Sequence, residues 1–228
     1  MSSVHRWGPE PARVLLIHGI TSSGATMWRL GEALAERGVV APDLRGHGEA
    51  PRAASYRAAD FASGLGSGWE LVIGHSLGGL IAAHAAVADP AFARRLILLD
   101  PVLEIADEDF PAVLESVVDE ARDPATEEAI RAENPGWHDE CVRAKALAGR
   151  QADPGAVERI MLDNAPWHHG ALADRLRVPT LILGGDPALG GMAGSHLGAG
   201  NPLVEYRMVA GAGHSVHRDR PDVVLEAV

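Results

Sequence analysis

The chain has 228 residues and a formal net charge of −11 at neutral pH. An acidic balance of this size repels other polyanions, so we expect neither nucleic acid nor an anionic membrane surface as a partner. The length fits one domain with a substantial core. The first ten residues lack the apolar core of a secretory signal and no apolar run approaches the ~20 residues that cross a bilayer, which favours a cytoplasmic location.

Short apolar runs alternate with helical stretches along most of the chain, which is typical of a parallel sheet covered by helices on both faces. The runs expected to form strands are, in chain order, Val4–Trp7 at an edge, Val14–Ile17, Val39–Pro42, Leu71–Ile73, Leu96–Leu99, Thr180–Leu183 and Val204–Val209. Apolar residues at helical spacing predict helices at Trp28–Arg37, Arg57–Gly64, Leu77–Ala88 and Pro221–Ala227. The sequence therefore predicts an α/β fold with a mostly parallel sheet.

One interval interrupts this alternation. Between Val102 and Arg177 the sequence has helical pieces separated by turn signals such as Asn134-Pro135-Gly136, and no strand signal. An excursion of this length is too long for a simple crossover between two strands. We interpret residues 102–177 as an inserted helical cap over the carboxyl ends of the strands, and residues 1–101 and 178–228 as the α/β core.

The segment Leu71–Gly79 is an apolar run that breaks into Gly-His-Ser-Leu-Gly-Gly and continues as an alanine-rich helix. Ser76 therefore lies on a tight turn between a strand and a helix, where the backbone is strained and the hydroxyl is pushed out of the sheet. Gly74 and Gly78 avoid collisions that larger side chains would make with the neighbouring strand and helix. The unpaired N–H groups at the start of the helix favour negative charge beside Ser76. These features indicate a nucleophile.

A serine nucleophile needs a base within hydrogen-bonding reach, and imidazole is the side chain best matched to neutral pH. Among the eleven histidines, His214 ends the small-residue loop Val209–His214 just past the last strand, from which it can reach the strand ends. His217 is the competitor, but it lies beyond the glycine hinge and is expected to begin the terminal helix. We predict His214 as the base.

The imidazole must also be held in one tautomer by a carboxylate. Asp100 ends the strand Leu96–Leu99 and Asp186 follows the strand Thr180–Leu183, so both lie at the carboxyl edge of the sheet. Each precedes a proline and can also be a turn residue. We predict Asp186 because the order Ser, Asp, His is usual for this kind of turn, with Asp100 as the alternative.

Acyl transfer further needs N–H donors aimed at the oxygen that becomes negative in the transition state, and one such donor contributes about 3 to 4 kcal/mol. The run His18–Thr21 leaves the strand Val14–Ile17 at the same edge, and Gly19 lets its backbone turn toward the pocket. The expected donors are the backbone N–H groups of Ile20 and Leu77.

Five motifs in this order resemble those of the α/β-hydrolase family and cover nearly the whole predicted core: His18-Gly19-Ile20, Asp43–Gly48, Gly74–Gly79, Asp186 and Gly211–His214. The resemblance implies Ser76 as nucleophile, Asp186 as acid, His214 as base and the Ile20 and Leu77 amides as the oxyanion hole. It implies a structural role for Asp43–Gly48.

Two departures from the family pattern matter. The antiparallel strands that often open the family's sheet are missing or reduced to Val4–Trp7, which leaves an edge open to pairing with a second copy, so a homodimer is an alternative to a monomer. A related acid loop often has one more residue between its glycine and its aspartate, and the shorter spacing at Gly184–Asp186 keeps Asp100 open as the acid.

These residues predict a two-step acyl transfer to a small-molecule substrate that needs no metal or organic cofactor. The expected substrate is a small or medium apolar ester, lactone or thioester. Trp137, Met161, Leu162 and Trp167 of the cap are candidates to line its pocket, although aromatic residues in an insert often pack it onto the core. Two alternatives stay open for the same fold: a ligand-sensing protein with vestigial turnover, and a cofactor-free perhydrolase that passes the acyl group to peroxide.

Overall fold

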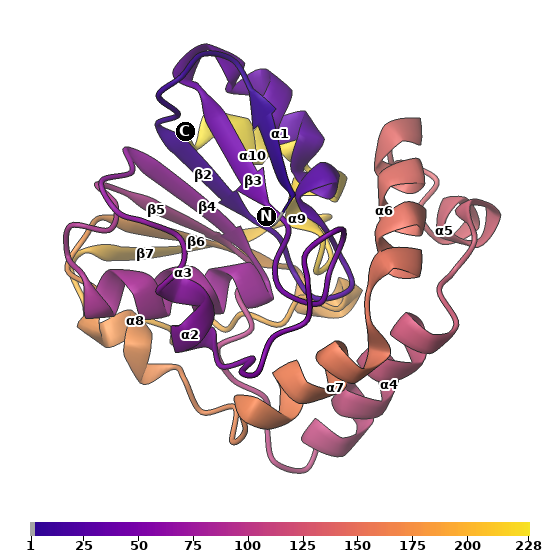
Figure 1. Ribbon diagram of the computed structural model, residues 1–228. Helices are drawn as coiled ribbons and strands as arrows, with labels where there is room; N and C mark the ends of the chain where they lie inside the picture. The colour runs from indigo at the N-terminus through magenta and orange to yellow at the C-terminus, as the bar shows by residue number, and fades with distance from the viewer. Residues whose placement is uncertain (1–2) are drawn as a thin grey trace.

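A computed structural model describes residues 3–228. Its centre is a seven-stranded sheet in the order β1-β3-β2-β4-β5-β6-β7 (Figure 1). β1 pairs antiparallel with β3 and all other neighbouring strands are parallel, so the predicted mostly parallel sheet is confirmed. The strands are β1 (Val4–Trp7), β2 (Val14–Ile17), β3 (Val39–Pro42), β4 (Leu71–His75), β5 (Leu96–Leu99), β6 (Thr180–Gly185) and β7 (Val204–Val209).

All seven predicted strands are present, and two of them, β4 and β6, run two residues further than predicted. The predicted helix Trp28–Arg37 forms in two pieces, α1 and the 3-10 turn η2. Outside the segment between β5 and β6, the helices and 3-10 turns are η1 (Gly24–Met27), α1 (Trp28–Ala33), η2 (Ala35–Arg37), α2 (Ala58–Ala62), α3 (Leu77–Ala88), η3 (Pro187–Leu189), α9 (Val216–Asp219) and α10 (Pro221–Glu226).

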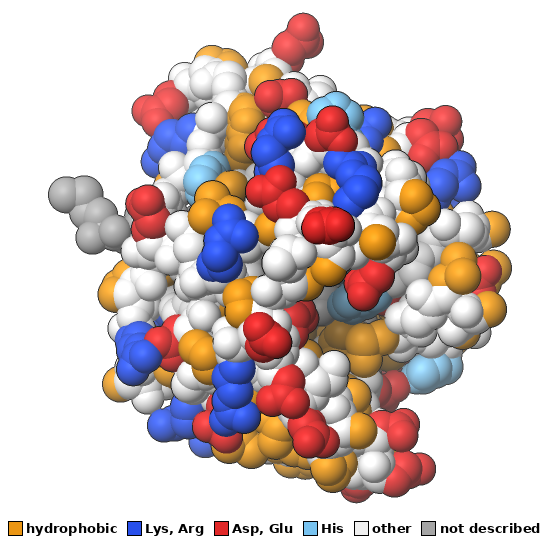
Figure 2. All heavy atoms as spheres, turned by 90° about the vertical axis from the view of Figure 1, so that its right-hand side faces the viewer, with side chains coloured by type: hydrophobic (Ala, Val, Ile, Leu, Met, Phe, Trp, Pro, Cys, Tyr) orange, Lys and Arg blue, Asp and Glu red, His pale blue; other side chains and the backbone are white. Residues whose placement is uncertain are grey.

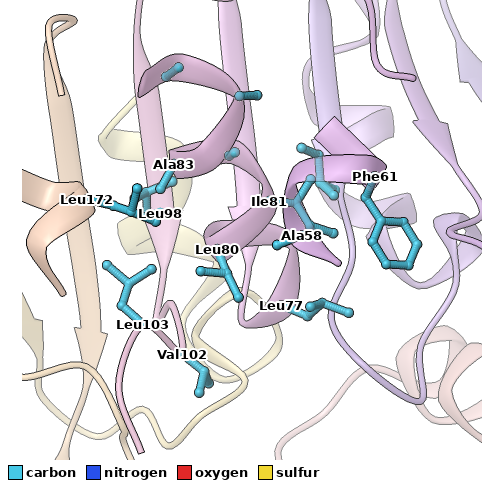
Figure 3. Packing of buried hydrophobic residues seen from close by; sticks show 14 of the residues in the cluster. Ala58, Phe61, Leu77, Leu80, Ile81, Ala83, Leu98, Val102, Leu103 and Leu172 are labelled. Carbon is cyan, nitrogen blue, oxygen red and sulfur yellow. The ribbon is translucent and has the colours of Figure 1, made fainter. Parts of the chain in front are cut away.

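Each face of the sheet carries its own hydrophobic cluster because side chains alternate along every strand. On β2, Leu15 and Ile17 join the cluster beneath α2, α3 and α8, whereas Val14 and Leu16 join the cluster beneath α1, α9 and α10. Figure 3 shows the first cluster around α3, with Leu80 and Ile81 of that helix between residues of its neighbours. This packing fixes α3, and with it the turn at the end of β4.

The segment between β5 and β6 contains five helices: α4 (Phe110–Arg122), α5 (Glu127–Glu133), α6 (Asp139–Gln151), α7 (Pro154–Asp163) and α8 (Ala171–Arg175). Helices α4 to α7 lie together beside the sheet, while α8 lies next to α3 (Figure 1). Leu172 of α8 packs with Leu98 and Ala83 of the core (Figure 3). We therefore propose that the functional cap is formed by α4 to α7 and that α8 covers the sheet.

The outer edge of the sheet at β1 is a short strand with half-buried and exposed side chains, and pairing with a second copy through it stays a prediction. None of the helices within residues 3–228 combines the length and apolar character that a bilayer crossing needs. Figure 2 shows the cap side, where acidic and basic side chains are interspersed and a hollow exposes histidine and hydrophobic atoms.

Candidate active site

Ser76 occupies a strained turn between β4 and α3, with φ 53° and ψ −117°. This left-handed conformation is unfavourable for a residue with a side chain, and it persists because both flanking elements are buried. A Cβ atom on Gly78 would lie 2.2 Å from the Ile17 carbonyl oxygen of β2, and one on Gly74 would lie 2.4 Å from the Gly78 carbonyl oxygen. The predicted collisions with strand and helix are therefore confirmed.

A cavity of about 260 Å³ lies at the carboxyl edge of the sheet, beneath the cap. The ends of parallel strands meet at one edge, so residues from distant parts of the sequence line the same space. Ser76, His214, Ile20 and Leu77 are all part of its lining, and so are the three predicted cap residues Trp137, Met161 and Trp167. Leu162 is half exposed on the outside of α7 and does not line the cavity.

The carboxylate beside His214 belongs to Asp100. His214 Nδ1 donates to Asp100 Oδ2 at 2.6 Å, and the Asp100 side chain is completely buried. Its carboxylate also accepts backbone N–H groups from Gly185, Met192 and Ala193, each at 2.9 Å. Burial raises the pKa of Asp100, but the hydrogen bond from His214 and the backbone donors outweigh it and leave that pKa below its usual value. Asp100 is thus an ionised partner that fixes the imidazole with its proton on Nδ1.

The prediction that Asp186 pairs with His214 is wrong. Asp186 begins the turn η3, where its carboxylate accepts the Ala188 N–H at 2.9 Å. Asp100, with φ 41°, bends the chain at the end of β5 so that its carboxylate lies against the end of β6 and the loop that follows. The neighbouring strand β5 therefore supplies the carboxylate beside His214, which the motif order had placed after β6.

A second histidine, which the sequence analysis did not single out, positions the loop that carries His214. His75, directly before Ser76, donates from Nε2 to the His214 carbonyl oxygen at 2.9 Å. Burial and the nearby His217 hold the pKa of His75 well below its usual value, so the ring is neutral. His217 itself is buried with neither ring nitrogen bonded to a described residue, its ring centroid 4.6 Å from that of His75. It is therefore not paired with Asp100.

The loop after β2 is held by two buried histidines from the predicted motifs. His18 Nε2 accepts the Leu44 N–H at 2.9 Å, and His47 Nε2 accepts the Thr21 N–H at 3.2 Å. Burial lowers the pKa of His18 to about 3 and that of His47 to about 4, so both rings are neutral acceptors at these nitrogens. The Asp43–Gly48 segment, which contains Leu44 and His47, thus braces the loop that carries Ile20.

The backbone N–H groups of Ile20 and Leu77 have no hydrogen-bond acceptor among residues 3–228. Leu77 is the first residue of α3, where helical N–H groups lack an intrahelical partner, and Ile20 lies beside it along the cavity wall. Gly19 lets this loop approach closely, because a Cβ atom there would lie 3.1 Å from that of Ser76. Two free donors are therefore available beside the serine.

A polar cluster links the cap to the loop that carries Ile20. Lys145 of α6 donates to the Thr21 carbonyl oxygen at 2.9 Å and to Glu120 of α4 at 2.5 Å. Burial lowers the pKa of Lys145, and the facing Glu120 carboxylate opposes that effect. Sequence reasoning missed this cluster because Thr21, Glu120 and Lys145 lie in three separate elements and share no motif.

Comparison with known proteins agrees with the geometry. A family model described as "Alpha/beta hydrolase family" matches residues 14–227. The chain belongs to this family. Lipase LipV of Mycobacterium tuberculosis is 44% identical over 110 residues, which cover 45% of this chain and 42% of that lipase, so the match spans less than half of either protein. The 2-(acetamidomethylene)succinate hydrolase of Mesorhizobium japonicum is 27% identical over 94% of this chain and 86% of its own length.

Solved structures share the fold of this α/β hydrolase across almost its whole length. The crystal structure of an E-2-(acetamidomethylene)succinate hydrolase has a TM-score of 0.81 and 23% identity and covers 98% of this chain and 92% of that one. A thermophilic esterase from Thermogutta terrifontis, solved with malate bound, has a TM-score of 0.75 and 22% identity over 99% of this chain and 90% of its own. Both likenesses are under 25% identical and show that the fold is shared.

Proposed function

We propose that this α/β hydrolase is a serine hydrolase that cleaves a carboxylic ester or a related acyl bond of a small substrate. The observation that carries the proposal is the strained Ser76 at the wall of a cavity that it shares with the His214–Asp100 pair. Strain of about 1 to 3 kcal/mol is retained in a fold where the surroundings enforce it, and such sites are often functional.

In the proposed mechanism, His214 removes the proton of Ser76 and the oxygen attacks the carbonyl carbon. Asp100 holds the imidazole with its proton on Nδ1, which leaves Nε2 as the acceptor, and stabilises the imidazolium that forms. The N–H groups of Ile20 and Leu77 bind the oxyanion. After His214 protonates the leaving group, it activates a water molecule that releases the acid, so the cycle is complete without a further cofactor.

The cavity size supports a small acyl substrate. About 260 Å³ is at or below the lower end of the ~300 to 1,000 Å³ that is usual for small-molecule sites. One wall is apolar, with Val102, Ile105 and Val113 beside the predicted Met161 and Trp167. The names of the relatives, a lipase, an esterase and a 2-(acetamidomethylene)succinate hydrolase, support acyl-bond hydrolysis as the reaction class.

Labelling with a fluorophosphonate, followed by mass mapping of the adduct, tests the proposal. We expect a single adduct on Ser76, and we expect Ser76→Ala to abolish both the adduct and the hydrolysis of nitrophenyl acetate. Ser67→Ala is the control, because Ser67 is exposed and lies outside this cavity, so labelling and turnover should stay intact. An adduct on another residue, or full turnover by Ser76→Ala, would refute the assignment.

A further inference from the structure

Arg218 is a buried cation at the wall of the candidate active site. It lies on α9, four residues after His214, is 4% exposed, and lines the same cavity as Ser76. Its guanidinium group is 5.1 Å from the ring centroid of Trp137, whose Nε1 donates to Asp219 at 2.6 Å. The guanidinium is thus held in a fixed orientation by a cap residue that is itself anchored.

No carboxylate forms an ion pair with this cation among residues 3–228, and Glu120 and Asp219 act on it only from a longer distance. Within the same residues its two terminal nitrogens donate to hydroxyl oxygens, Nη1 to Ser215 and Nη2 to Ser22, each at 3.2 Å. Its Nε has no hydrogen-bond partner among residues 3–228, and no carboxylate in that part of the chain lies within 4.0 Å of the guanidinium. Burial lowers the pKa of Arg218, yet a guanidinium remains protonated at neutral pH.

Lys145, the other cation of the cavity wall, provides the contrast. It forms an ion pair with Glu120 at 2.5 Å, so the two charges offset each other. Arg218 has no ion pair of this kind within the described residues, in a protein whose formal net charge is −11. A local positive site in an acidic protein indicates that the cavity selects for an anion.

Leaving a charge buried and unpaired is costly, and folded proteins avoid it unless a ligand or partner completes the pair. A guanidinium presents a planar fork of N–H donors that matches a carboxylate. The partners of Arg218 here are two hydroxyl groups and an aromatic face, which orient the fork without neutralising it. A purely structural arginine would not need to face the cavity that holds Ser76.

We propose that the substrate of this hydrolase carries its own carboxylate, which Arg218 binds while Ser76 attacks the scissile carbonyl. The substrate class is therefore a short ester, or related acyl compound, of a dicarboxylic acid type, with the free carboxylate a few bonds from the reacting carbon. This inference rests on the proposed function and refines it from an apolar ester to an anionic one. The apolar wall then contacts the short carbon chain between the two polar ends.

A matched pair of esters tests the proposal. Monomethyl succinate carries the free carboxylate, and methyl levulinate has nearly the same shape with a neutral methyl ketone in its place. Their hydrolysis is followed by base titration at constant pH. We expect kcat/KM to be at least about tenfold higher for monomethyl succinate, since a charge-assisted hydrogen bond contributes on that order.

Three variants connect the preference to Arg218. Arg218→Met keeps the unbranched apolar stem of the side chain and removes the charged guanidinium. It should lower kcat/KM for monomethyl succinate about 10- to 100-fold while changing kcat/KM for methyl levulinate less than about threefold. Arg218→Lys should recover part of the loss. Arg220→Met is the control, because Arg220 is more exposed, pairs with Asp222 and lies outside the cavity. Arg220→Met should leave kcat/KM unchanged for both esters.

The wild-type protein provides a measurement that does not depend on folding of a variant. Succinate, but not the neutral succinamide, should inhibit hydrolysis and slow fluorophosphonate labelling of Ser76. Equal kcat/KM for the two esters with no inhibition by succinate would overturn the carboxylate site and leave serine hydrolysis standing. Failure to hydrolyse either ester together with an unlabelled Ser76 would overturn both.

Discussion

Exchanging Asp100 and Asp186 separately for asparagine distinguishes the carboxylate that acts on His214 from the one that does not. Asp100 accepts four hydrogen bonds, one from His214 and three from backbone N–H groups. Asparagine has a single acceptor oxygen, so its NH₂ group must face either the imidazole or a backbone donor. Oδ1 of Asp100 accepts two backbone N–H groups and Oδ2 accepts only one besides His214, so the amide oxygen is expected to take the place of Oδ1 and the NH₂ group to face the imidazole. The imidazole can then pair with it only in the wrong tautomer, and such a change lowers kcat by about 10³- to 10⁴-fold.

The expected result for Asp186→Asn is a kcat within about threefold of the wild type, because an asparagine oxygen can still accept the Ala188 N–H. Both variants are assayed on the same ester at saturating substrate, and their unfolding in urea is measured alongside. Asp100→Asn should also lower the free energy of unfolding by about 1 to 3 kcal/mol, since a buried donor loses its acceptor. A larger loss of kcat in Asp186→Asn than in Asp100→Asn would refute the pairing as the catalytic one.

Two further predictions concern stability. Gly78→Ala should lower the free energy of unfolding by about 3 kcal/mol or more, because its Cβ would meet a backbone carbonyl at 2.2 Å. Gly136 has open space around it, so Gly136→Ala should change the free energy of unfolding by less than about 0.5 kcal/mol. Urea denaturation measures both. His47 binds its proton with a pKa of about 4 when folded and near 6.5 when unfolded, so stability falls as pH decreases between these values, by roughly 3 kcal/mol at about 1.4 kcal/mol per pKa unit. His47→Gln should remove this contribution and lower the slope of stability against pH, while the buried His18 and His75 keep theirs; the exposed His196→Gln should leave the slope unchanged.

The five inner strands could be predicted because each contains a short apolar run, and burial on both faces of a parallel sheet requires such a run. The edge strands β1 and β7 contain polar residues and are partly exposed. The ends of β4 and β6 were underestimated where His75 and the two glycines Gly184 and Gly185 continue the ladder without apolar side chains. The helix Trp28–Arg37 broke into two because Leu34, at its junction, leaves helical geometry with φ −105° and ψ 10°. The local sequence pattern therefore predicts which elements form more accurately than it predicts where each element ends.

The site was predictable to the extent that it is built from local motifs. Ser76 and its glycines lie within nine consecutive residues, and the loop of His214 directly follows a strand. The choice between Asp100 and Asp186 depended on the backbone path at the ends of two neighbouring strands. That path cannot be read from the order of the motifs. Arg218 had no sequence signal, because its proposed role depends on three-dimensional contacts with the cavity, Ser22, Ser215 and Trp137, which no local pattern shows.

The loop after β6 contributes to the Asp100–His214 pair, although Asp186 itself is not part of that pair. That loop does not carry the carboxylate, but it still orients it, since Met192 and Ala193 donate their N–H groups to Asp100. Backbone donors cannot be removed by side-chain substitution, so the sequence of the loop can vary while its path is kept. Asp186 is then free to begin the turn η3, which sets that path, and Met192 is left to line the cavity beside the reacting groups.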